Sequence, residues 1–66
     1  MPEYSNSLIE HIISEHVHSE RDRRILRRRF IDGIRFEPLA EEFDMSVRGI
    51  KYLVSSYQEK LKPYLH

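Results

Sequence analysis

Residues 36–61, FEPLAEEFDMSVRGIKYLVSSYQEKL, decide the fold of this chain of 66 residues. Their apolar side chains recur at helical spacing in two series, and each series marks one buried face of a helix. The series are Leu39, Ala40 and Phe43, and then Ile50, Leu53, Tyr57 and Leu61. Between them, Asp44 tolerates a left-handed turn and Ser46 is a good N-cap. We therefore expect a short helix over about residues 36–43, a tight turn, and a long helix over about residues 47–62, which together form a helix-turn-helix.

A first helix is expected near the start of the chain, over about residues 3–17. Its apolar side is formed by Tyr4, Leu8, Ile9, Ile12, Ile13, His16 and Val17. Pro2 suits a helix start, although Ser5 or Ser7 offers an N-cap for a later beginning. On the opposite side, Glu10 is expected to face water together with its polar neighbours His11 and Glu15.

A second helix is expected over about residues 20–32. Ser19 and Asp22 resemble a capping box in which Asp replaces the usual Glu. Gly33 suits the left-handed residue that commonly follows the last turn of a helix. This helix carries most of the arginines of the chain, and Arg29 falls beside its buried face. We expect Arg29 to be structural and to pair with one of two acidic residues of the next helix, Glu41 or Glu42.

The composition indicates one small all-α domain of four helices that spans residues 1–66. This length is near the lower limit for folding without disulfides or metals, and the chain contains no cysteine. The longest uninterrupted apolar run is residues 52–54, which is far too short for a transmembrane helix or a signal peptide. We therefore expect a cytoplasmic protein that does not associate with a membrane.

We expect neither enzyme activity nor a bound metal or cofactor. The sequence has no glycine-rich phosphate loop, no cysteine nucleophile and no pair of carboxylates in an apolar setting. Its histidines lie at positions 11, 16, 18 and 66, and the pair at 11 and 16 is too widely spaced for two ligands on one helix face.

The net charge of the chain is zero, but its charges are unevenly distributed. Residues 21–35 contain seven arginines and two aspartates, whereas residues 36–46 contain four acidic residues and no basic one. Residues 47–66 carry four lysines or arginines and one glutamate. A basic middle and a basic C-terminal helix are typical of a surface that contacts nucleic-acid phosphates.

Residues 23–61 resemble the fourth conserved region of the sigma-70 family of bacterial sigma factors. The segments that carry the likeness are RDRRILRRRFIDG at 21–33, FEPLAEEFDMS at 36–46 and VRGIK at 47–51. As in that family, an Arg-aromatic pair ends one helix, a Glu-rich short helix has a central Ala, and the next helix has Ile at its fourth position. These features are Arg29-Phe30, Ala40 and Ile50. The resemblance implies a DNA-binding helix-turn-helix, which we expect in a free-standing regulator of a bacterium, a phage or a mobile element.

The chain departs from the family at several positions. Asp44 replaces a usual Gly, and Arg28 replaces a usual apolar residue. The base-contacting run of the family is rich in Arg, Glu and Gln, whereas the matching positions here are Val47, Arg48, Lys51 and Tyr52. The resemblance therefore predicts the scaffold and does not predict the DNA sequence that is bound.

The long helix is expected to enter the major groove with its outward side chains on base edges. The expected contacts of this helix and its cap are Ser46, Val47, Arg48, Lys51, Tyr52 and Ser55. Arg48 and Lys51 suit guanine O6 and N7, and Val47 suits a thymine methyl. Phosphate contacts are expected from Arg24, Arg27, Arg28 and Arg35, so that the second helix supplies much of the affinity. The competing interpretation of both sets is a solvated helix face.

Two functions of different classes follow from these features. The first is a sequence-specific regulator of transcription that binds double-stranded DNA. A homodimer on a pseudo-palindromic site is plausible, because the first helix is rich in Ile and Leu and the C-terminal end adds Leu61, Tyr64 and Leu65. The alternative is an interaction module that mimics a sigma region and docks on RNA polymerase or on an inhibitor. The replacement of polar base-contacting residues by Val47 and Tyr52 favours this alternative.

Overall fold

The computed structural model describes residues 5–65, and within this range the chain is all-α and forms four helices. They are α1 (Asn6–His16), α2 (Glu20–Phe30), α3 (Phe36–Glu42) and α4 (Val47–Leu61), followed by a short 3-10 turn, η1 (Lys62–Tyr64). The fold class expected from the sequence is confirmed. Across the described residues, no helix combines the length and the apolar character that crossing a membrane requires.

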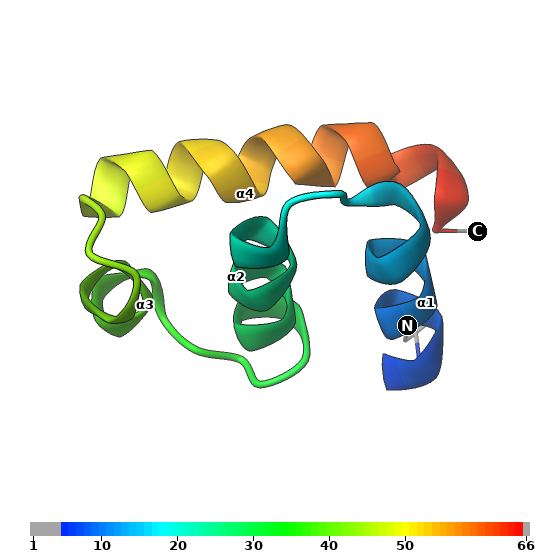
Figure 1. Ribbon diagram of the computed structural model, residues 1–66, viewed down its shortest axis with the longest axis horizontal. Helices are drawn as coiled ribbons and strands as arrows, with labels where there is room; N and C mark the ends of the chain where they lie inside the picture. Colours follow the sequence, from blue (N-terminus) through cyan, green and yellow to red (C-terminus); the bar gives the residue numbers. More distant parts are fainter. Residues whose placement is uncertain (1–4, 66) are drawn as a thin grey trace.

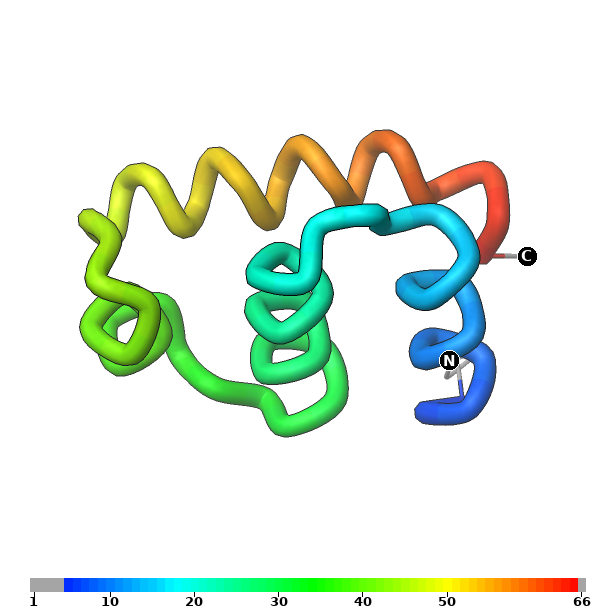
Figure 2. The backbone as a smooth tube through the Cα atoms, viewed as in Figure 1, coloured from blue at the N-terminus to red at the C-terminus, as the bar shows by residue number. Residues whose placement is uncertain are grey.

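The helix α4 is the longest element and runs along one side of the whole molecule (Figure 1). The helices α1, α2 and α3 lie next to one another on the other side, with α3 beneath the beginning of α4 and α1 near its end (Figure 2). After α4 the chain bends back toward α1, where the rings of His16 and Tyr64 stack with their centroids 3.8 Å apart. His16 therefore contacts Tyr64 at the surface and does not belong to the apolar side of α1.

The core lies between α4 and the other three helices. Its buried members are Ile12, Ile13, Val17, Ile25, Leu26, Leu39, Ala40, Ile50, Val54 and Leu61. The sequence prediction missed Val54, which is only 2% exposed. It also placed Leu53 and Tyr57 fully inside, whereas both are half-buried. The centre of the buried stripe of α4 therefore lies closer to Val54 than predicted, because Ile50, Val54 and Leu61 are buried while Leu53 and Tyr57 are only half-buried.

Three serines cap three of the helices. Ser5 accepts a hydrogen bond from the Leu8 amide at 3.1 Å, so α1 begins at Asn6 and not near residue 3 as predicted. The predicted start at Pro2 and the contact of Tyr4 lie outside the described residues. Ser19 and Ser46 cap α2 and α4 in the same way, as expected. The helices α2, α3 and α4 each end one or two residues before the predicted boundary.

Two left-handed residues shape the loops on either side of α3. Gly33 has φ 71° after α2, and Asp44 has φ 54° in the turn before α4. In this turn the Met45 amide donates to the Ala40 carbonyl at 2.8 Å, which ends α3 and redirects the chain. Both left-handed residues were predicted from the sequence and are confirmed.

Candidate nucleic-acid interface

The exposed face of α4 carries a stripe of side chains opposite the core. Arg48, Tyr52 and Ser55 follow one another at spacings of four and three residues, so they share one face of the helix. All three are exposed, and Tyr52 is the most exposed large apolar side chain of the described residues, at 77%. These three residues, called the α4 stripe below, match the outward set predicted from the sequence.

Two other residues predicted to point outward have different surroundings. Val47 is half-buried and packs against the core, so the prediction that it belongs to the outward set is wrong. It lies on the same side of α4 as Ile50 and Val54, which explains its burial. Lys51 is exposed, but it lies on the flank of the helix with its Nζ 5.8 Å from the centre of the Phe36 ring.

Ser46 has a defined structural role at the beginning of α4. Its Oγ accepts a hydrogen bond from the Gly49 amide at 3.0 Å and thereby satisfies one of the free amides of the first turn. A Cβ on Gly49 would lie only 3.1 Å from this Oγ, which explains the glycine in the first turn of a helix. Because the Ser46 hydroxyl accepts this hydrogen bond, its main role is to fix the residue at which α4 begins.

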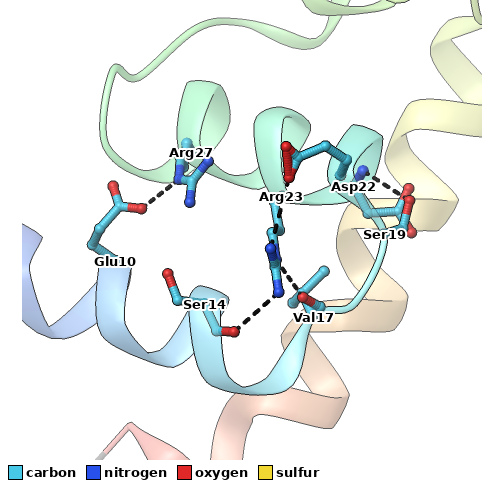
Figure 3. Close-up of polar contacts among 8 residues, drawn as sticks. Glu10, Ser14, Val17, Ser19, Asp22, Arg23 and Arg27 are labelled. Atoms are coloured by element: carbon cyan, nitrogen blue, oxygen red, sulfur yellow. Dashed lines mark hydrogen bonds and ion pairs between the residues drawn. The ribbon is translucent and has the colours of Figure 1, made fainter.

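Several arginines of α2 make contacts within the protein. Arg23 donates from Nε to the Val17 carbonyl at 2.5 Å and from a terminal nitrogen to the Ser14 carbonyl at 3.2 Å (Figure 3). It thus caps the end of α1, a role that the sequence analysis missed. Arg27 forms an ion pair with Glu10 of α1 (Figure 3), so Glu10, which is partly exposed as expected, also joins α1 to α2.

Arg28 and Arg29 hold the connection between α2 and α3. Arg28 forms ion pairs with Glu42 at 2.9 Å and with Asp32 at 3.1 Å, and hydrogen bonding to Glu42 is the main cause that raises the Arg28 pKa. Arg29 donates to the Ile34 carbonyl at 3.0 Å and lies 4.3 Å from the centre of the Phe36 ring. Arg29 is structural as predicted, but the predicted pairing is wrong, because its neighbour Arg28 takes the Glu42 carboxylate.

A buried carboxylate joins α2 to α4. Asp22 is 8% exposed, and its Oδ2 accepts a hydrogen bond from the Tyr57 hydroxyl at 2.5 Å. Its Oδ1 accepts from Arg21 at 3.2 Å, and the Asp22 amide donates to the Ser19 cap. The hydrogen bond to Asp22, followed by desolvation, raises the Tyr57 pKa. Asp22 therefore orients α4, instead of completing the capping box that the sequence suggested.

Most of the basic residues that have no acidic partner lie outside α2. Within residues 5–65, no ion pair involves Arg24, Arg35, Arg48, Lys51, Lys60 or Lys62. Arg35 is exposed and directly precedes Phe36, whose ring also contacts Lys51. Arg35 and Lys51 are therefore brought to one end of the molecule, beside Arg48. Arg24 is exposed on α2, in a shallow hollow that it shares with Arg27, Arg28 and Glu42.

Acidic side chains border this basic end. Glu37, Glu41 and Asp44 are exposed on α3 and in the turn that follows it. At this end of the molecule, the α4 stripe with Arg35 and Lys51 is therefore the surface that favours a polyanion. No protein-family model, curated protein or solved structure matches this chain.

Proposed function

We propose that this protein is a transcriptional regulator that binds double-stranded DNA sequence-specifically through α4. The observation that carries the proposal is the α4 stripe. It presents a cation, an aromatic ring and a hydroxyl on the exposed face of the second helix of a helix-turn-helix, and Arg48 has no acidic partner within the described chain. The resemblance to the fourth region of sigma factors supports the same function.

The stripe has the dimensions and the chemistry that a major groove requires. The groove is about 12 Å wide and admits one α-helix. The Arg48 guanidinium can donate two parallel hydrogen bonds to guanine O6 and N7, and the Ser55 hydroxyl can donate to or accept from a base edge. Arg35 and Lys51, at the side of the stripe, are placed to contact the phosphates that border the groove.

In this proposal the arginines of α2 build the domain more than they bind DNA. Arg23, Arg27, Arg28 and Arg29 already donate to groups of the protein. Moving any of them to a phosphate would break a contact that joins two helices or closes a helix end. Arg24 is the residue of α2 that remains available for a phosphate contact.

Self-association through the C-terminal end has weaker support than the sequence suggested. Leu61 is buried, Leu65 is half-buried and Tyr64 stacks on His16, so these side chains mostly cover their own domain. A remaining apolar hollow of about 230 Å³ lies between α1 and the end of α4.

The alternative proposal is a module that docks on RNA polymerase or on an inhibitor. It is favoured by the exposed ring of Tyr52 and by the exposed acids Glu37, Glu41 and Asp44, because a polyanion gains nothing from these acids. Purified polymerase distinguishes the two functions. Retention of the protein on polymerase without DNA, together with no salt-dependent DNA binding, would support docking.

The test of DNA binding is selection of duplexes from a random pool, followed by titration of the selected site. The DNA-binding proposal predicts an enriched sequence and a loss of at least about fivefold in affinity in Arg48→Ala, the size of one good base contact of about 1–3 kcal/mol. Lys51→Glu should also weaken binding, while Lys62→Glu, which makes the same charge change at the far end of α4, should have little effect. If both glutamate variants weaken binding equally, α4 does not lie in the groove as proposed.

A further inference from the structure

Tyr52 is an aromatic residue without an apparent structural task. It is 77% exposed in the middle of a helix whose buried side is already filled. We propose that Tyr52 selects the DNA sequence by packing its ring against the C5-methyl group of a thymine in the major groove. This proposal rests on the proposed function and names the base that the site prefers.

The surroundings of Tyr52 let its ring protrude. Small residues lie one turn before and one turn after it, at Gly49, Ser55 and Ser56. Two adjoining shallow hollows border the ring, one reaching Met45 and the other reaching Glu59. The ring therefore stands above its surroundings. Such a shape fits into a groove better than onto a flat surface.

The charges beside the ring indicate which kind of partner covers it. Arg48 lies one turn before Tyr52 and Lys51 directly precedes it, and both are exposed without an acidic partner among residues 5–65. An aromatic ring beside two such cations suits a polyanion that has an apolar group at the bottom of a charged groove. Double-stranded DNA has this arrangement, because the thymine methyl is the apolar group among the base edges of the major groove.

The structure also makes the other candidate for the methyl contact less accessible. The sequence suggested Val47, but Val47 packs against the core. On the α4 stripe, Arg48 and Ser55 are polar, so the ring of Tyr52 is the apolar surface that this face offers. A methyl group covered by the ring leaves water, and this transfer favours thymine over a base without the methyl.

The experiment compares thymine with deoxyuridine, which lacks only the C5-methyl group. In the selected site, each thymine is replaced in turn by deoxyuridine, and affinities are measured for the protein and three variants. The unmodified protein should lose roughly fourfold at one or two positions, the factor expected for one buried methyl group. Tyr52→Phe should keep this loss, and Tyr52→Ala should bind the two forms equally. Tyr64→Ala, which removes the other exposed tyrosine, should behave like the unmodified protein.

Each other outcome overturns the inference in a recognisable way. If the protein selects a site but no deoxyuridine replacement weakens binding, the methyl contact is wrong while the proposed function stands. If Tyr52→Phe loses the discrimination, the hydroxyl and not the ring makes the contact. If no sequence is selected, the proposed function and this inference both fail. If Tyr52→Ala abolishes retention on polymerase and leaves DNA binding unchanged, the ring serves a protein partner. Circular dichroism of each variant verifies that the helices are intact.

Discussion

At the scale of single residues, the contact between Tyr57 and Asp22 is the most consequential polar interaction of the fold. It joins the beginning of α2 to the second half of α4 across 35 residues of sequence. We expect Tyr57→Phe to lower the free energy of unfolding by about 2 kcal/mol, because a buried carboxylate then loses its hydroxyl donor. Urea unfolding followed by circular dichroism measures this change. Tyr64→Phe removes the corresponding hydroxyl from an exposed ring and should change the stability little. Equal losses in both variants would show that the contact with Asp22 does not stabilise the fold.

The same contact gives the stability a dependence on pH. The Tyr57 pKa is raised above its ordinary value of 10.0, first by the hydrogen bond to Asp22 and then by desolvation. The protonated form of the Tyr57 hydroxyl is therefore favoured in the folded state. Its stabilisation is complete below pH 10 and is lost as the pH rises through the raised pKa. The stability difference between the unmodified protein and Tyr57→Phe should therefore shrink above pH 10, and a difference that stays constant would contradict this interpretation.

At the scale of the helices, the orientation of α4 about its own axis decides which residues are buried and which face outward. Val54 is 2% exposed and Val47 is half-buried, and alanine removes the same two methyl groups from each. We expect Val54→Ala to lower the free energy of unfolding by about 2 kcal/mol and Val47→Ala by about half as much. Thermal or urea unfolding measures both. A negligible effect at Val47 would restore the orientation that the sequence suggested, with Val47 facing outward.

The end of α1 depends on an arginine of the next helix. Arg23 donates to the carbonyls of Ser14 and Val17, which have no partner within their own helix. We expect Arg23→Ala to cost about 1–2 kcal/mol of stability. Arg24→Ala is the matched control, because Arg24 is exposed and has no ion pair among the described residues. If the unfolding curves of the two variants coincide, the Arg23 contacts contribute nothing to the stability.

The sequence was sufficient for features that depend on neighbouring residues. The caps Ser19 and Ser46, the left-handed Gly33 and Asp44, and the four helices all follow from local patterns. Features that depend on how helices cross were not predictable. Whether Glu42 pairs with Arg28 or with Arg29 depends on the rotation of α2 against α3. The acceptors of Arg23 are backbone carbonyls, which every residue has and no sequence pattern marks. For Val47, a modest rotation of α4 about its own axis separates a base contact from a core contact.

At the scale of the whole molecule, the positive charge that has no acidic partner lies in a different place from the most basic segment of the sequence. The chain is neutral, and its most basic segment is the second helix. In the folded protein, contacts with Glu10, Glu42 and Asp32 engage much of that positive charge inside the domain. The cations that remain without acidic partners include Arg35, Arg48 and Lys51, at the end of the molecule where α4 begins. We therefore expect DNA to be attracted to this end, and not to α2.

The most direct measurement of this central claim is the dependence of DNA affinity on salt concentration. Each phosphate contact contributes about −0.9 to the slope of log K against log salt concentration. Arg35→Ala and Lys51→Ala should each make the slope less negative by about this amount, whereas Arg28→Ala should leave it nearly unchanged. The contradicting result is the reverse: a reduced slope in Arg28→Ala, with unchanged slopes in Arg35→Ala and Lys51→Ala, would assign the DNA-binding surface to α2.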